Sequence, residues 1–409
     1  MVVVDILNKK RLGKELSYQE LDFIFNGYLN GTVKDYQMSS LLMAICINGM
    51  SDEEIFCLTK IFVDSGEILE FPDIEGIKVD KHSTGGIGDK TTLVIAPIVA
   101  SCGVPVVKMS GRGLGYTGGT IDKLESIPGF KTRLTENQVL KQVKDIGIAL
   151  TGQTANLAPM DKVIYALRDV TGTVSSVPLI ASSIMSKKIA SGADKILIDI
   201  KVGKGALLRT REEAKDLGEL MIKIGKVYNR EVRIKISDMN IPLGYCVGNS
   251  LEVLEAMDVL KGKDTTSNLA ELCVELATDM VSMGKEIPKA AAHVLVLESL
   301  NKGLAYQKFL EFVKIQGGNI DGVEISNKRK RIKARCDGVV KRIDALELGK
   351  LAVALGAGRR TKEDKIDHGV GIKLHKHIGD VVKKGDVLAT LYINETSDYS
   401  DINNIFDIK

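Results

Sequence analysis

The spacing of apolar residues divides the chain into a helical beginning, a mixed middle and a strand-rich end. Over residues 1–66, apolar side chains recur at the three- and four-residue spacing of amphipathic helices. From residue 77, short β-branched runs end at glycines and are followed by helical stretches, which is typical of an α/β domain. A helical pattern returns over residues 161–192, and short strands with glycine turns predominate from about residue 331.

Individual elements follow from the same pattern. Runs of apolar and β-branched residues predict strands at 104–107, 196–202 and 232–236. Amphipathic spacing predicts helices at 209–227, 249–261 and 264–283. Ser51, followed three residues later by Glu54, indicates a capped helix start.

Charge and aromatic content narrow the classes of function. The 56 basic and 53 acidic residues leave a formal net charge of +3, so we expect no nucleic-acid partner. Trp is absent and aromatics make up 5% of the chain, which argues against stacking on single-stranded bases. The basic run at residues 328–331 is interpreted as a solvated connector before a strand, with a polyanion-binding patch as the alternative.

Cysteine usage and hydropathy favour a cytoplasmic protein. The six cysteines are scattered and form no CxxC pair, so a zinc site is not indicated and reduced thiols are expected. Asp5 comes too early for a signal peptide. The longest apolar stretch, residues 91–107, is interrupted by two prolines, so no membrane span is expected.

Two glycine-rich loops carry the candidate chemistry. They are residues 81–92 (KHSTGGIGDKTT) and residues 108–120 (KMSGRGLGYTGGT), each between a predicted strand and a predicted helix. Glycine lets backbone N–H groups approach an anion closely, and hydroxyl and ammonium groups add charge-assisted hydrogen bonds. The loops together predict a site for one phosphate, with candidate ligands Lys81, Ser83, Thr92, Lys108, Ser110 and Thr120.

Other interpretations of these loops remain open. Gly113, Gly115 and Gly118 satisfy the GxGxxG pattern of a dinucleotide site, although the neighbouring Ser-Gly-Arg and Thr-Gly-Gly-Thr favour phosphate. The glycines could also serve only to form turns. Neither loop contains the Gly-Lys pair of a Walker A motif. His82 stands where the predicted strand meets the first loop, which makes it a candidate general acid or hydrogen-bond donor.

The second loop resembles the motif of a known enzyme family. Residues 110–125 (SGRGLGYTGGTIDKLE) closely resemble the thymidine and pyrimidine-nucleoside phosphorylases, and the resemblance continues at 165–171 (YALRDVT) and 183–188 (SIMSKK). It covers nearly the whole chain. The family fold implies a small α domain (1–66 and 161–192), a large mixed α/β domain (67–160 and 193–330) and a strand-rich C-terminal subdomain (331–409).

The C-terminal subdomain has a resemblance of its own. Residues 378–389 are similar to the barrel-sandwich folds of biotin and lipoyl carrier domains. No convincing carrier-lysine hairpin lies between the matching strands. A structural role is therefore favoured over a covalent cofactor carrier.

The resemblance implies an activity and a set of residues. The activity is reversible phosphorolysis of uridine, thymidine and deoxyuridine, carried out by a homodimer whose cleft closes on phosphate and nucleoside. The implied catalytic residues are His82, Arg168 and Lys187, and Tyr165 and Ser183 complete the base site. The chemistry needs no cofactor, but some members hold a structural potassium ion, whose implied ligands here are Gly88, Lys90, Leu243, Cys246 and Glu255.

These residue types suit the chemistry. The leaving pyrimidine gains negative charge while the sugar becomes oxocarbenium-like, and Arg168 and Lys187 on neighbouring predicted helices can stabilise that charge. The alternative for Arg168 is a surface ion pair with Asp169. Tyr116 replaces the family's usual histidine and cannot titrate near neutral pH, yet His82 is retained, so activity is expected.

Three alternatives to a broad-specificity phosphorylase remain. Lys108, before Met-Ser-Gly-Arg, resembles the broad pyrimidine type, but a thymidine-restricted enzyme is the first alternative. The second is a phosphoribosyltransferase of the anthranilate type, which would need pyrophosphate and magnesium carboxylates. The third is a nucleoside binder without catalysis, suggested by Tyr116.

Overall fold

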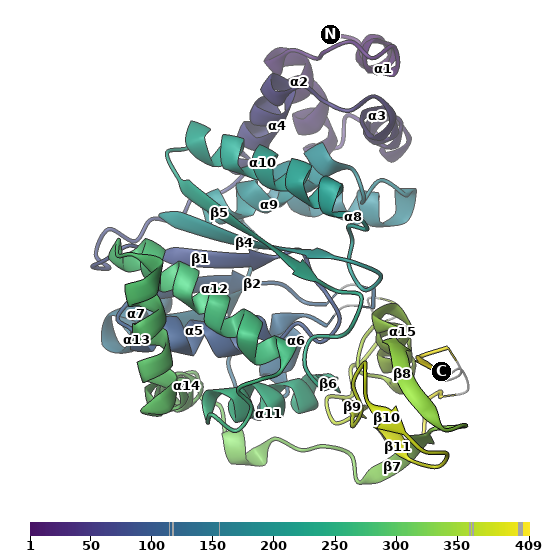
Figure 1. The fold of residues 1–409 in the computed structure, drawn as a ribbon. Helices are drawn as coiled ribbons and strands as arrows, with labels where there is room; N and C mark the ends of the chain where they lie inside the picture. Colours follow the sequence, from purple (N-terminus) through teal and green to yellow (C-terminus); the bar gives the residue numbers. More distant parts are fainter. Residues whose placement is uncertain (114, 117, 155, 360, 362–363, 400–403) are drawn as a thin grey trace. The chain divides into compact units, whose positions relative to one another are not determined.

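A computed structural model describes residues 1–409 except 114, 117, 155, 360, 362–363 and 400–403 (Figure 1). Leu114 and Thr117 of the second loop motif thus lie outside the described residues. The chain forms two compact units. The first unit comprises Met1–Pro72, Gln153–Ile198 and Thr210–Ile234, and the second comprises Asp73–Gly152, Asp199–Arg209 and Lys235–Lys409. Their bounds differ from those of the three predicted domains: residues 193–198 and 210–234, predicted in the large α/β domain, belong to the first unit, and the predicted C-terminal subdomain belongs to the second.

The first unit is mainly helical. Its helices are α1 (Val3–Arg11), α2 (Tyr18–Leu29), α3 (Asp35–Asn48), α4 (Asp52–Asp64), α8 (Pro159–Thr171), α9 (Val177–Ala190) and α10 (Arg211–Val227). The predicted start of α4 is confirmed: Ser51 Oγ accepts from the Glu54 N–H (3.4 Å), and the Glu54 carboxylate accepts from the Ser51 N–H (2.9 Å). The same carboxylate binds the buried Lys10 ammonium at 2.7 Å, which ties α1 to α4.

One apolar core joins the N-terminal helices to α8 and α9. Buried side chains of α2 and α4, such as Phe25 and Phe62, whose rings meet edge to face, belong to the same cluster as Met160 and Ile164 of α8. Leu179 of α9 also belongs to it. Residues 161–192 therefore return to the N-terminal helices, as the resemblance implied, because α8 and α9 supply apolar side chains that complete this core.

The second unit contains an α/β part. Its elements are β1 (Val79–Ser83), α5 (Thr91–Ser101), β2 (Val106–Ser110), α6 (Thr120–Glu125), α7 (Glu136–Ile146), β3 (Ile148–Gly152), β6 (Cys246–Val247), α11 (Asn249–Leu260), α12 (Asn268–Lys285), α13 (Lys289–Asn301), α14 (Leu304–Ile315) and the 3-10 turn η1 (Ile320–Gly322). Strands β4 (Lys195–Val202) and β5 (Glu231–Asp238) have residues in both units and follow β1 in the sheet order β1-β4-β5. Strands β2 and β3 run parallel, with Val106 opposite Ile148.

This arrangement places both glycine-rich loops at the carboxyl ends of strands, because the loops follow β1 and β2. Helix α5 packs against β2, β3 and α12, and its residues 91–100 are all buried. The apolar stretch that contains Pro97 is thus a buried helix. In open α/β sheets, ligands bind at the carboxyl ends of the strands, so the fold supports these loops as the site.

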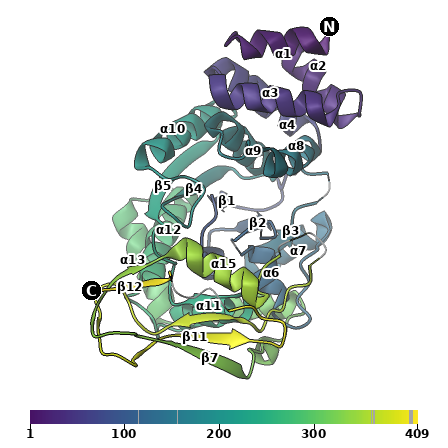
Figure 2. The ribbon, with the colours of Figure 1, turned by 90° about the vertical axis from the view of Figure 1, so that its right-hand side faces the viewer.

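The tail of the second unit forms two small antiparallel sheets. Its elements are β7 (Lys328–Lys333), β8 (Gly338–Ile343), α15 (Ala345–Leu355), β9 (Gly371–Leu374), β10 (Val381–Val382), β11 (Val387–Ile393) and β12 (Phe406–Ile408). The sheet orders are β10-β8-β12 and β6-β9-β11-β7, and Figure 2 shows β11 and β7 side by side. Strand β6 comes from the α/β part, so that part contributes a strand to the tail, with Cys246 opposite Lys373.

Two sequence expectations need correction. The basic run at 328–331 is not a connector before a strand: it forms most of β7, an exposed edge strand paired with β11. Charged side chains on an edge strand discourage pairing with another chain. The strand predicted at 104–107 begins two residues later, because Pro105 has no N–H to donate, whereas the Val106 N–H donates to Gly147 O (2.9 Å).

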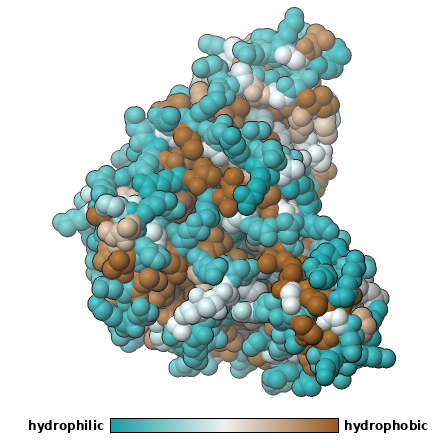
Figure 3. Space-filling view, in the orientation of Figure 1, coloured by the Kyte–Doolittle hydropathy of each residue, from teal (hydrophilic) through white to brown (hydrophobic). Residues whose placement is uncertain are grey.

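The surface and the helix lengths also bear on the membrane expectation. The face drawn in Figure 3 is largely hydrophilic, with apolar patches between the polar residues. Within the part of the chain that the structure describes, no helix has both the length and the apolar character needed to cross a membrane.

Candidate active site

The first glycine-rich loop runs from β1 to α5 and is closed by a carboxylate. The Lys81 ammonium donates to Thr91 Oγ1 (2.6 Å) and lies 3.3 Å from Asp199 Oδ2 of β4. Ser83 Oγ donates to Asp89 Oδ2 (2.5 Å), and Thr91 Oγ1 donates to Asp89 Oδ1 (2.6 Å). The loop is therefore held in shape by its own side chains.

Two aspartates balance the buried lysines at this loop. Asp199 lies 2.6 Å from the Lys201 ammonium and accepts from Ser237 Oγ (2.6 Å). Burial alone would raise the pKa of Asp89, but Lys81, Lys201 and the two hydroxyl donors hold that pKa well below its usual range. Burial would lower the pKa of Lys201, and the nearby carboxylates raise it instead. Asp89 and Lys201 thus both remain charged in the folded protein.

The second glycine-rich loop runs from β2 to α6 and starts beside the first. The Lys108 ammonium donates to the backbone carbonyl of Lys81 (2.6 Å) and lies 3.0 Å from Asp80 Oδ1. Ser110 ends β2 and is buried, and Thr120 is the first residue of α6. The six predicted phosphate ligands, including Thr92 in the first turn of α5, therefore all belong to the second unit.

A buried aspartate fixes the second loop. Asp122 Oδ2 accepts from the Gly113 N–H (2.6 Å), while its Oδ1 accepts from Arg359 (2.9 Å) and Arg112 (3.2 Å). A Cβ at Gly119 would lie 2.1 Å from the Gly113 nitrogen, so only glycine fits there. This close approach of the backbone explains one glycine of the motif by packing alone.

The predicted base-site residues come together in the first unit. The Tyr165 ring centroid lies 5.7 Å from both the Arg168 guanidinium carbon and the Lys187 ammonium. Lys187 donates to Ser183 Oγ (3.0 Å) and to Asp161 Oδ2 (2.6 Å). Burial raises the pKa of Tyr165, so the phenol stays neutral at physiological pH. We call Tyr165, Arg168, Ser183 and Lys187 the base cluster.

Arg168 is held by backbone carbonyls. It is 1% exposed, and its guanidinium donates to the carbonyls of Thr173 (3.2 Å), Val174 (2.7 Å) and Leu179 (3.2 Å). Burial lowers the pKa of Arg168, but a guanidinium remains charged in proteins. A surface ion pair with Asp169 therefore does not describe this arginine.

His82 lies inside β1, between Lys81 and Ser83, and is partly buried. Successive side chains of a strand point to opposite faces, so the imidazole lies on the face opposite to its two neighbours. Its predicted place beside the base carbonyl stays a prediction.

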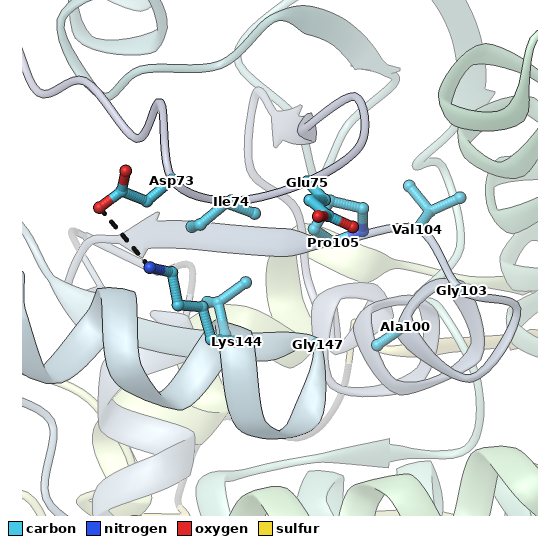
Figure 4. A pocket seen from close by; sticks show the side chains of 10 residues that line it. Asp73, Ile74, Glu75, Ala100, Gly103, Val104, Pro105, Lys144 and Gly147 are labelled. Carbon is cyan, nitrogen blue, oxygen red and sulfur yellow. Dashed lines mark ion pairs between the residues drawn. The ribbon is translucent and has the colours of Figure 1, made fainter.

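A separate hollow of about 490 Å³ lies at the other end of the strands (Figure 4). It is lined by Val104 and Pro105, just before β2, and by Gly147, just before β3. An ion pair between Asp73 and Lys144 (3.5 Å) lies at its edge. Because the glycine-rich loops leave the opposite ends of the strands, this hollow is not the candidate active site.

Comparisons with known proteins identify the family. The glycosyl transferase family α/β-domain model matches residues 75–306, its helical bundle domain matches 4–66, and the pyrimidine nucleoside phosphorylase C-terminal domain matches 339–406. A pyrimidine-nucleoside phosphorylase from Bacillus subtilis is 50% identical over 414 residues, which cover 100% of this chain and 95% of that protein. The chain belongs to the pyrimidine-nucleoside phosphorylase family.

Further relatives agree with this membership. Pyrimidine-nucleoside phosphorylases from Staphylococcus haemolyticus and Geobacillus stearothermophilus are each 50% identical, covering 96% of this chain and 92% of each protein. Anthranilate phosphoribosyltransferase from Thermus thermophilus has a TM-score of 0.59 at 18% identity, over 76% of this chain and 99% of that one, which shows a common fold only. The protein is an enzyme of the pentosyltransferase type, and the predicted fold class is confirmed.

The cation ligands implied for a pyrimidine-nucleoside phosphorylase also come together, within the second unit. The Lys90 ammonium itself donates to Leu243 O (2.9 Å), Cys246 O (2.7 Å) and Glu255 Oε2 (2.5 Å). The Gly88 backbone lies against the same carbonyls. Burial would lower the pKa of Lys90, but Glu255 and Glu252 together with the other nearby groups raise it. A potassium ion does not fit among these residues, because an ammonium already uses their oxygens.

Sequence reasoning missed the carboxylates that organise both groups of residues. These are Asp80, Asp89, Asp122, Asp161 and Asp199. Asp199 had a detectable signal, since it interrupts an apolar strand at residues 196–202. A charge in a fully buried strand requires a partner, and here the partners are lysines of the site.

Proposed function

We propose that this protein catalyses the reversible phosphorolysis of pyrimidine nucleosides. Uridine, thymidine and deoxyuridine would yield the free base and ribose or deoxyribose 1-phosphate. The observation that carries the proposal is the pair of glycine-rich loops, which start side by side through the bond from Lys108 to Lys81 O. Support also comes from the full-length relatives at about half identity that are named pyrimidine-nucleoside phosphorylases.

The loops suit inorganic phosphate. Lys81 and Lys108 supply positive charge, and their buried aspartate partners keep that charge stable before phosphate arrives. Ser110 and Thr120 place hydroxyl groups at the end of β2 and the start of α6. Such a mixture of ammonium, hydroxyl and backbone N–H donors matches the acceptor oxygens of a phosphate dianion.

The base cluster suits the leaving pyrimidine. An ammonium has three N–H donors, and two of those on Lys187 bind Asp161 and Ser183, so one remains for a carbonyl of the base. The Arg168 guanidinium is held rigidly by three carbonyls and still has two N–H groups beyond those bonds. Donors fixed in advance stabilise developing charge without reorganisation.

The proposed reaction is one displacement. A phosphate oxygen forms a bond to the anomeric carbon as the bond from that carbon to the base nitrogen breaks, and the electron pair leaves with the base. His82 donates a hydrogen bond or a proton to the base carbonyl. Lys187 and Arg168 stabilise the negative charge on the ring until the base is protonated. No cofactor takes part.

We further propose that the enzyme is a cytoplasmic homodimer whose cleft closes around both substrates. Closure would exclude water, which otherwise competes with phosphate as the nucleophile. Sedimentation equilibrium tests the dimer. Small-angle scattering with phosphate and a nonreactive nucleoside analogue tests closure, which should decrease the radius of gyration.

One assay tests the function directly. The protein is incubated with phosphate and uridine, thymidine, cytidine or inosine, and free base is measured with and without a magnesium chelator. Release of uracil and thymine that depends on phosphate but not on magnesium supports the proposal. Release of thymine alone indicates a thymidine-restricted enzyme, and a magnesium requirement indicates a phosphoribosyltransferase. No release of base with any nucleoside would overturn the proposal, because neither a nonenzymatic binder nor a phosphoribosyltransferase without pyrophosphate releases base from a nucleoside.

A further inference from the structure

The Lys90 side chain ends inside a ring of oxygen atoms of the kind that binds cations. Its ammonium donates to Leu243 O, Cys246 O and Glu255 Oε2 at 2.9, 2.7 and 2.5 Å. These three bonds use all three N–H groups of the ammonium. The Lys90 side chain is fully buried, and that of Glu255 is 6% exposed.

The ring is closed on its remaining side by backbone. Gly88 has a φ of +74°, and a Cβ there would lie 2.7 Å from Leu243 O and 3.4 Å from the Lys90 ammonium. Any side chain at position 88 would therefore displace one of the groups in the ring. Two carbonyls, one carboxylate and a glycine thus surround a single positive charge.

Both oxygens of the ring's carboxylate also accept hydrogen bonds. Glu255 Oε1 accepts from the Tyr245 N–H (2.5 Å), and Oε2 accepts from the Cys246 N–H (3.0 Å) in addition to Lys90. A second cation would share this one carboxylate with the ammonium, because the neighbouring Glu252 carboxylate already lies 3.4 Å from the Lys123 ammonium. The ring therefore has enough negative charge and enough oxygen ligands for one monovalent cation only.

We propose that the Lys90 ammonium is a covalently attached replacement for a bound monovalent cation, which makes this protein independent of potassium. The lysine joins the first glycine-rich loop to two segments more than 150 residues further along the chain, residues 243–246 and helix α11 through Glu255. A free ion would have to be captured from solution, whereas the tethered ammonium is present as soon as the chain folds. The position of Lys90, directly before Thr91 and Thr92, gives this anchor a role in fixing the start of α5.

The first test measures whether potassium stabilises the wild-type protein. Thermal unfolding is followed in 0–100 mM potassium chloride, with tetramethylammonium chloride keeping the ionic strength constant. We expect the melting temperature to change by less than about 1 °C, because a ligand stabilises only a state that binds it. Thallium-205 NMR, with Tl⁺ as the potassium surrogate, should show no saturable site on the wild-type protein.

Two substitutions at Lys90 distinguish the effect of the side chain's volume from the effect of its charge. Lys90→Ala removes the ammonium and opens the ring, so potassium should raise its melting temperature saturably by about 3 °C. Lys90→Met removes the charge but fills most of the space, so its lower melting temperature should not respond to potassium. Lys10→Ala is the matched control, since Lys10 is a buried ammonium bound to both oxygens of Glu54 but to no ring of carbonyls. It should be destabilised without a response to potassium.

The outcomes decide the proposal in every case. Saturable stabilisation of the wild-type protein by potassium, or a saturable thallium site on it, would overturn the proposal even if neither variant folds. A folded Lys90→Ala protein that shows no potassium response would also overturn it, because the ring would then not be a cation site. An equal response of Lys10→Ala and Lys90→Ala would show a general salt effect and overturn it too.

Discussion

The glycine-rich loops and the base cluster differ in how their buried positive charges are compensated. At the loops each lysine has a buried carboxylate close by, as in the pairs Lys108–Asp80 and Lys201–Asp199, with Lys81 near Asp199 and Asp89. Cations and anions are balanced there. A balanced set is stable in the empty enzyme, because each of these buried lysines has a carboxylate partner.

In the base cluster the charges are not balanced. Asp161 is the buried carboxylate bound to Lys187, while Arg168 is held by the carbonyl dipoles of residues 173, 174 and 179. One positive charge is therefore in excess. The difference fits the proposed reaction. Phosphate is already charged when it binds, whereas the base gains its negative charge only as the bond to the sugar breaks. An uncompensated cation therefore stabilises the departing base most in the transition state.

The largest expected effect comes from breaking the balance at the loops. Asp199→Asn removes the carboxylate bound to Lys201 and close to Lys81, and leaves Asp89 as their remaining counter-charge, so the free energy of unfolding should fall by about 3–5 kcal/mol, measured by urea denaturation. Asp216→Asn, on the exposed face of α10, should change it by less than about 0.5 kcal/mol. Equal effects of the two substitutions would contradict the balanced-charge interpretation.

The next effect concerns the excess charge of the base cluster. Arg168→Ala and Lys187→Ala should each lower kcat/KM for uridine at least about 100-fold, the scale of losing one donor to the transition state. Lys162→Ala, at an exposed position of the same helix α8, should be near normal. Near-normal rates in both site variants, with folding verified by circular dichroism, would refute their assignment.

Low pH should destabilise the folded protein through protonation of Asp89 in the first glycine-rich loop. Its pKa is depressed in the folded protein, so its contribution to stability is complete above the unfolded pKa of about 4 and is lost as pH falls through the folded pKa. The wild-type protein should therefore lose stability below about pH 4. Asp89→Asn should lose less over the same interval in urea melts at pH 7 and pH 3.5, and equally steep curves would argue against this role.

The smallest effect is expected at Tyr116 in the second loop. This side chain is 48% exposed and stands where the family's usual histidine was expected. Tyr116→Phe should change kcat by less than about threefold, well below the 100-fold or more that a general acid or base supplies. A large loss of kcat in this variant would show that the tyrosine hydroxyl takes part in the reaction.

Local features of the chain were determined by the sequence. The capping box at Ser51, the apolar spacing of the N-terminal helices and the glycine-rich loops all depend on neighbours within a few residues. For the same reason β4, β5 and the helices from α10 to α12 lie close to their predicted positions. The long motif at residues 110–125 was sufficient to indicate the family.

The tertiary structure decided which residues that are distant in sequence form ion pairs. No local pattern pairs Lys187 with Asp161 or Lys81 with Asp199, because these contacts depend on how helices and strands pack. The same holds for β6, which joins the sheet of the tail, and for the basic run that became an edge strand. Lys90 shows the limit most clearly: the family resemblance implied it as a potassium ligand, but burial beside Glu255 placed its ammonium where the ion was expected.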